Sequence, residues 1–164
     1  MQRTIIAVAD ATRGRLFLFD RSDDAGHPRE TLTELTDLVN PQRRQTPAQL
    51  FSDTRTNTSR MGGRFFGVDD HRDAHIDKID VDFASSIAAA IAKAVRENGA
   101  RRVIVCASPR MLGMLRTTDL RTDGVVIDEL ARDYVKLTAP QIHEQLVDHG
   151  LLLPSPPRPG LSAH

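Results

Sequence analysis

The stretch Val103–Leu115 constrains the fold more than any other part of the chain, because it joins two kinds of regular structure without a linker. Its first part, Val103–Ala107, is apolar and mostly β-branched, which is typical of a strand covered on both faces in a parallel sheet. Ser108 is a good N-cap, and Pro109 suits the first position of a helix. The stretch therefore predicts an α/β fold in which this strand lies at the centre of the sheet and leads directly into a helix.

Length and composition fit one globular domain. The chain has 164 residues, of which 40% are hydrophobic and 27% charged, enough for the core of a domain of about 100–150 residues. The formal net charge of +0 gives no overall attraction to nucleic acid or acidic membranes, so such binding must come from local clusters. Cys106 falls in the predicted buried strand, where a thiol is a poor nucleophile. The sequence shows neither an export signal nor a membrane-spanning apolar run, and we expect a cytoplasmic protein without membrane contacts.

Three antiparallel strands are expected in the first part of the chain. They are Thr4–Ala9, Arg15–Phe19 and Thr31–Val39. Between the first two, Asp10 suits an Asx-type turn and Gly14 a positive φ, so we expect a hairpin. The polar stretch Arg21–Pro28 is predicted to be a loop.

A long helix is predicted from about His71 to Asn98, because apolar residues recur there at spacings of three or four. The apolar positions are Ile76, Ile79, Phe83, Ile87, Ile91 and Val95. Asp70 is the expected N-cap and Gly99 the expected residue after the C-cap. The acidic, β-branched part Ile76–Asp82 is expected to fray or break the helix.

The order of the elements is that of a ribonuclease H-like topology. A buried strand at Val125–Ile127 and a helix from Thr138 to about His149 follow the central strand. Right-handed crossovers place the last two strands parallel to the first, which gives a mixed five-stranded sheet. We predict a single domain over residues 1–149 and a proline-rich disordered tail over residues 150–164.

Polar residues follow the strands that we predict to be parallel, so they should meet at one edge of the sheet. They are Asp10, Arg13, Arg15, Ser108, Arg110, Asp133 and Lys136. This group could bind phosphate through its arginines, or act as a hydrolase centre with a metal or a phosphorylated substrate. A two-metal nuclease centre is disfavoured, because Val103–Ala107 carries no acid. The structural alternative is that Asp10 forms the hairpin turn and that Arg110 and Asp133 form an ion pair.

A second group of candidates lies in and before a predicted mobile loop over residues 52–68. It consists of Arg43, Arg44, Arg55, Arg60, Gly62, Gly63 and Arg64. The arginines suit RNA phosphates, the glycines allow close approach of the backbone, and Phe65 and Phe66 could stack on a base. The alternative is an exposed disordered loop with the two phenylalanines packed back on the domain.

His71 and His75 stand at i and i+4, which places two imidazoles on one helix face, as in a two-histidine metal pair. No third ligand is obvious, and an acidic first helical turn that complements the helix dipole explains the same residues more simply. We therefore expect no cofactor.

Five motifs in order resemble the bacterial host attachment protein family. They are Val8–Arg15, Asp37–Arg44, Ser52–Arg55, Ala107–Arg116 and Asp133–Thr138, and the resemblance spans roughly Ile5 to Leu146. That family is similar to the middle domain of archaeo-eukaryotic peptide-chain release factors, which implies a ribonuclease H-like fold. Those factors carry a Gly-Gly-Gln loop before a long helix. Here Arg64 follows Gly62 and Gly63, which counts against release-type hydrolysis.

The function expected from these features is a non-enzymatic binding domain associated with translation, with RNA or the ribosome as partner. A metal- or phosphate-dependent hydrolase at the sheet edge around Asp10 and Ser108–Arg110 is the alternative. A regulatory module that forms a homodimer is a third reading that the sequence leaves open.

Overall fold

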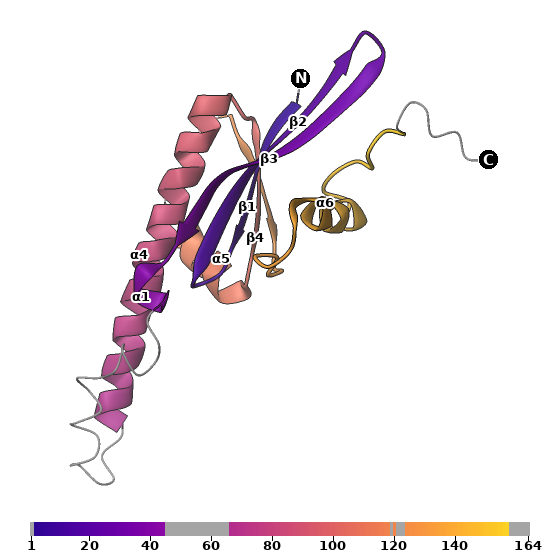
Figure 1. The fold of residues 1–164 in the computed structure, drawn as a ribbon. Helices are drawn as coiled ribbons and strands as arrows, with labels where there is room; N and C mark the ends of the chain where they lie inside the picture. The colour runs from indigo at the N-terminus through magenta and orange to yellow at the C-terminus, as the bar shows by residue number, and fades with distance from the viewer. Residues whose placement is uncertain (1, 45–65, 119, 121–123, 158–164) are drawn as a thin grey trace.

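A mixed five-stranded sheet forms the centre of the protein (Figure 1). The computed structural model describes residues 2–44, 66–118, 120 and 124–157. The elements are β1 (Gln2–Ala9), β2 (Arg13–Asp24), β3 (His27–Val39), α1 (Pro41–Arg44), α4 (Phe66–Asn98), β4 (Arg102–Ala107), α5 (Pro109–Thr117), β5 (Val126–Leu130) and α6 (Ala139–Asp148). The strand order is β3-β2-β1-β4-β5, with β1, β2 and β3 antiparallel and β4 and β5 parallel to β1. The predicted α/β fold with its mixed sheet is confirmed.

Helices cover both faces of the sheet, and the alternation along β1 shows how. Ile5 and Ala7 pack in one apolar cluster with α4 and α5, whereas Ile6 and Val8 pack in a second cluster with α6. The strand order places β1 at the centre of the sheet. Our expectation that the apolar run Val103–Ala107, which forms β4, would be the central strand is therefore wrong. The expectation of a buried last strand is also wrong, because β5 is an edge strand and Val126 is 61% exposed.

The hairpin of β2 and β3 is longer than the sequence indicates. Pairing continues to Asp24 and His27, so the predicted loop over Arg21–Pro28 is mostly strand. The chain reverses at Ala25 and Gly26, whose φ values are 54° and 78°. Figure 1 shows this end of the hairpin projecting beyond the rest of the sheet. Residues there are largely exposed, so no apolar alternation marks the strands.

Gly14 is required for close packing, and not for the positive φ that we predicted. It lies in β2, and a Cβ atom built on it would lie 3.0 Å from Ile87 Cγ1 and 3.2 Å from Ile87 Cδ1. Ile87 is itself 1% exposed, so it has little room to move away. Glycine at this position therefore allows α4 to lie close against the sheet.

We expect Gly14→Ala to lower the free energy of unfolding by about 1–3 kcal/mol, because the added methyl group overpacks the contact with Ile87. Urea denaturation measures the change. Gly113→Ala is the matched control, since no atom lies within 4 Å of its built Cβ and α5 should gain from alanine. Equal stability of the two variants would contradict the packing role of Gly14.

The helix α4 has 33 residues and is therefore about 50 Å long. Gly99 follows it with a φ of 61°, and the Ala100 N–H donates to the Val95 carbonyl, which confirms the predicted C-terminal cap. The predicted start is wrong, because the helix begins at Phe66 and Asp70 lies inside it. Residues 66–68 of the predicted loop are thus helical, and the expected break at Ile76–Asp82 is absent.

The last part of the chain follows the prediction closely. Ser108 Oγ accepts from the Met111 N–H and caps α5, and Thr138 caps α6 in a capping box with Gln141. The described residues after α6, up to 157, form neither helix nor strand. Leu152 is nonetheless buried in the cluster beneath α6, so the apolar core extends past Asp148.

Candidate functional site

The carboxyl ends of β1, β4 and β5 lie at one edge of the sheet, as we predicted from their parallel order. Ala9 pairs with Ala107, so Asp10 and Ser108 leave the sheet next to each other. Asp133 and Lys136 follow β5 at the same edge, and both are exposed. The backbone therefore places the residues predicted from the sequence near one another at this edge. Whether they can bind a ligand depends on the hydrogen bonds and ion pairs that their side chains already form.

Asp10 forms the turn between β1 and β2. Its Oδ1 atom accepts from the Thr12 N–H at 2.7 Å, the Thr12 hydroxyl at 2.7 Å and the Arg13 N–H at 2.8 Å. This confirms the structural alternative for Asp10, an Asx-type turn. One of the two carboxylate oxygens is thus already engaged by three donors, which limits what Asp10 offers to a metal ion or substrate.

Arg13 and Arg15 both pair with acids on β3. Arg13 and Asp37 form a two-contact ion pair, and the hydrogen bond from Arg13 lowers the pKa of Asp37. Arg15 donates to Glu34 and also to the carbonyls of Val135 and Leu137, at 2.9 and 2.6 Å. Its side chain is only 10% exposed, so Arg15 ties β2 to the segment before α6.

Asp80 is the residue that organises the charges beside this edge, and sequence reasoning missed it. Its side chain is fully buried on α4, and both of its oxygens accept from Arg43 at 3.0 Å. Arg110 donates to Asp80 as well as to Asp77. Burial opposes ionisation of Asp80, but hydrogen bonds from Arg43 and Arg110 outweigh it and hold the pKa of the carboxyl below its ordinary value. Two arginines that we predicted to bind phosphate are thus joined by one carboxylate.

The ion pair that we expected between Arg110 and Asp133 is absent from the described part of the chain. Arg110 turns to α4 instead, and Asp133 Oδ1 accepts from the Val135 N–H at 3.1 Å. The reason is geometric, because Arg110 lies in the first turn of α5 and the contacts of α5 are with α4 and β4.

The remaining predicted residues lie partly outside the described residues. The structure does not describe five of them, namely Arg55, Arg60, Gly62, Gly63 and Arg64. Arg44 is described only as the last residue of α1. His71 and His75 both stand on α4, and His75 is exposed. Among the described residues, no three His, Cys, Asp or Glu side chains are grouped as a metal ion would require.

Nucleophilic chemistry at Cys106 is also disfavoured. Burial raises the pKa of its thiol to about 12, so almost none of it is thiolate at neutral pH. The described side chains at the carboxyl edge therefore form a structural network of turns and ion pairs.

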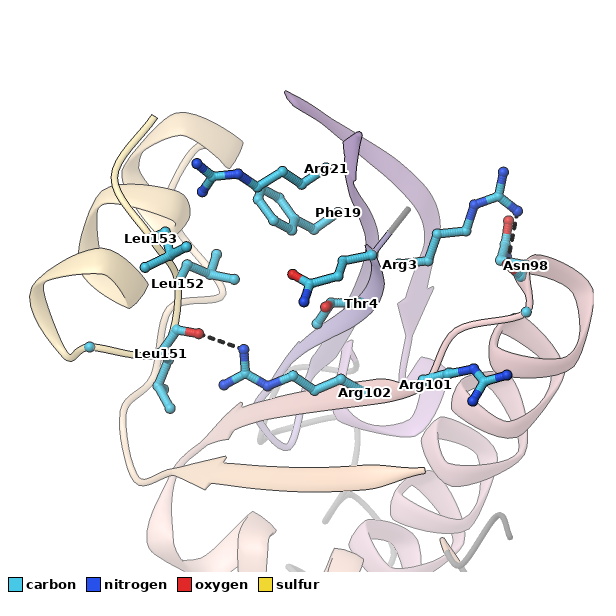
Figure 2. A pocket seen from close by; sticks show the side chains of 13 residues that line it. Arg3, Thr4, Phe19, Arg21, Asn98, Arg101, Arg102, Leu151, Leu152 and Leu153 are labelled. Carbon is cyan, nitrogen blue, oxygen red and sulfur yellow. Dashed lines mark hydrogen bonds between the residues drawn. The ribbon is translucent and has the colours of Figure 1, made fainter. Parts of the chain in front are cut away.

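Two features at other places were not found from the sequence. His143 Nε2 on α6 lies 2.5 Å from Glu30 Oε1 on β3, beside a cavity of about 410 Å³. A larger cavity of about 610 Å³ lies at the amino ends of β1 and β4 (Figure 2), and we call it the amino-edge pocket. Its lining includes Arg3, Arg21, Arg101 and Arg102. The clustering of these arginines follows from strand pairing, which composition alone does not reveal.

Comparison with known protein families supports the resemblance to host attachment proteins. No helix in the described part of the chain is long and apolar enough to span a membrane. No curated protein matches the chain. A family model described as "Protein required for attachment to host cells" matches residues 5–146, which run from β1 into α6. The chain therefore belongs to this family of proteins required for attachment to host cells.

Proposed function

We propose that this family member is a non-enzymatic binding protein that associates with RNA or ribosomes in the cytoplasm. Its contact residues would be the arginine-rich segment over residues 43–64, together with the carboxyl edge of the sheet. The similarity to release-factor middle domains is part of the same proposal. The observation that carries it is the position of α4 relative to the core.

The first turns of α4 extend away from the domain. Residues 72–78 of α4 are exposed or intermediate, and Ile79 is the first buried side chain after them. Figure 1 shows this end of α4 reaching beyond the sheet. The extension from Phe66 to Lys78 corresponds to about 20 Å of helix. Arg55, Arg60 and Arg64 come directly before it in the sequence, so the helix is suited to present a basic segment at a distance from the core.

The hydrolase alternative has weaker support. Arg43 and Arg110 are neutralised by Asp80 and Asp77, and Asp10 Oδ1 is engaged in its turn. A catalytic edge would need acids or bases that are not already committed to internal contacts. Binding through the edge requires only exposed groups, such as Lys136 and Asp133.

We expect the wild-type protein to co-sediment with ribosomes at low salt and to dissociate as salt is raised, because phosphate contacts release counterions. The triple variant Arg55→Ala, Arg60→Ala, Arg64→Ala should lose most of this binding. The slope of log affinity against log salt concentration should become shallower by about 3, or about one per arginine. Sedimentation through a sucrose cushion at several salt concentrations measures both effects.

A matched control removes three positive charges elsewhere. Arg29→Ala, Lys93→Ala, Arg96→Ala changes exposed residues on β3 and α4, away from the carboxyl edge, and it should bind ribosomes like the wild type. If the wild-type protein stays in the supernatant at low salt, the proposed function is wrong. If the control loses as much binding as the test variant, the effect reflects net charge and the arginine-rich segment is not the contact.

A further inference from the structure

Among the described residues, the lining of the amino-edge pocket includes four arginines and no acidic residue. The arginines are Arg3, Arg21, Arg101 and Arg102, and the cavity volume is about 610 Å³. This volume lies in the range of pockets that enclose a small organic ligand. The formal net charge of the chain is +0, so these guanidinium groups form a local positive patch that the overall composition does not explain.

Strand register explains how part of this lining reaches one face of the sheet. Thr4 pairs with Phe19 on β2 and with Arg102 on β4, and Gln2 pairs with Arg21. Side chains of paired residues lie on the same face, which here is the face covered by α6. Figure 2 shows Arg21 and Phe19 reaching from β2 toward Leu152 and Leu153, and Arg3 and Arg101 reaching toward the end of α4.

Two of the four arginines hold the pocket together. Arg102 donates to Asp128 at 2.8 Å and to the Leu151 carbonyl at 2.6 Å, which fixes the chain after α6 as one wall. Arg3 donates to the Asn98 carbonyl at 3.0 Å and contacts Asp20 at 3.4 Å. Both side chains are thus committed to the walls, and each guanidinium group is paired with a carboxylate.

Arg21 differs from these two. Its Nη1 atom is buried and finds no hydrogen-bond partner among the described residues. A buried donor without a partner costs free energy, so its presence calls for an explanation such as a bound ligand. Among the described residues, no carboxylate forms an ion pair with Arg21 or with the exposed Arg101. Glu30 stands opposite Arg21 in the register of β2 and β3, but its carboxylate lies against His143, and Arg21 Nη1 is left as a donor for a ligand.

We propose that the amino-edge pocket binds a phosphate monoester with an apolar or aromatic body. A phosphate monoester carries a charge of about −1.5 to −2 and three acceptor oxygens, which suits the buried Nη1 donor of Arg21 in a pocket lined by further arginines. Phe19 and Leu152 are 4% and 7% exposed and form an apolar floor, and Leu153, at 64% exposed, adds apolar surface to the wall. This site lies at the opposite end of the sheet from the carboxyl edge, and it does not depend on RNA binding.

Phenyl phosphate is a suitable probe, because it combines a dianionic phosphate with an aromatic ring. We expect saturable one-site binding to the full-length protein by isothermal titration calorimetry, with benzoate and inorganic phosphate binding more weakly. Arg21→Ala should raise the dissociation constant of phenyl phosphate about tenfold or more, since it removes a charge-assisted contact. Arg101→Ala, at an exposed position, should raise it by a smaller factor.

Arg132→Ala is the matched control, because Arg132 is exposed after β5 at the other end of the sheet. It should leave phenyl phosphate binding unchanged. Arg21→Ala should unfold at the same urea concentration as the wild type, or a higher one, because it removes an unpaired buried group. Absence of saturable binding, or equal weakening by Arg132→Ala, would overturn the proposal. Benzoate binding as tightly as phenyl phosphate would overturn the assignment to phosphate.

Discussion

Replacing Asp80 by alanine is expected to lower the free energy of unfolding by about 3–5 kcal/mol, which is the usual effect of removing one partner from a buried ion pair. Asp80 is fully buried and holds Arg43 of α1 and Arg110 of α5 on α4. Without the carboxylate, the guanidinium groups of Arg43 and Arg110 would lose their shared partner, and a cavity would remain at position 80. Urea-induced unfolding followed by circular dichroism measures the loss.

Asp77→Ala is the control for this prediction. Asp77 also pairs with Arg110, but its side chain is 62% exposed, so the change should cost less than about 1 kcal/mol. Asp80→Asn keeps the shape and removes the charge, and it should lie between the two. If Asp80→Ala and Asp77→Ala were equally stable, Asp80 would not join the three helices as we describe.

The stability that Asp80 contributes to the folded protein depends on pH. The pKa of Asp80 is lower in the folded protein than its ordinary value of 3.8, so the folded state favours the ionised carboxylate. The stabilisation is therefore complete above the unfolded pKa, and it is lost as pH falls through the folded pKa. The difference in stability between wild type and Asp80→Asn should be constant near neutral pH and shrink below about pH 4.

Features determined by a few neighbouring residues could be predicted from the sequence. The caps at Ser108 and Thr138, the turn at Asp10 and the glycine after α4 all depend on local hydrogen bonds and backbone angles. The strand directions follow from the same local order together with the handedness of crossovers. For these features the chemistry of a short stretch is sufficient.

Asp80 shows why part of the site could not be predicted in the same way. Its partners Arg43 and Arg110 lie 37 and 30 residues away, so their contact depends on how three helices pack. A signal was nevertheless present. Asp80 stands beside Ile79 and three positions before Phe83, within the apolar stripe of the helix. An acid in such a stripe must be buried with a partner or break the helix, and we had expected a break.

The roles of Arg21 and Gly14 depend on pairing between strands. Gly14 is needed because Ile87, on a different element, lies next to it, and Arg21 enters a pocket because it pairs with Gln2. The known tendency of ligands to bind at the carboxyl ends of parallel strands directed attention to the other edge of the sheet. Only the register of β1 with β2 and β4 brings the pocket arginines together.

Arg15→Ala is expected to lower the free energy of unfolding by about 3 kcal/mol, because it leaves buried acceptors without their charged donor. Arg15 donates to the Val135 and Leu137 carbonyls and to Glu34, and its guanidinium lies 5.0 Å from the centre of the Phe17 ring. Lysine has a single ammonium group and cannot reproduce the planar fork, so Arg15→Lys should recover only part of the loss. Urea denaturation measures both variants.

Arg13→Ala on the same strand separates a structural role from a ligand-binding role of Arg15. Arg13 is 38% exposed and its ion pair with Asp37 is at the surface, so the change should alter stability by less than about 1 kcal/mol. If Arg15 acted mainly on a phosphate ligand, both variants would be equally stable and would differ only in binding. A large loss of stability for Arg15→Ala alone would instead show that Arg15 joins β2 to the segment before α6. In that case the exposed residues Asp133 and Lys136 would remain for partners at this edge.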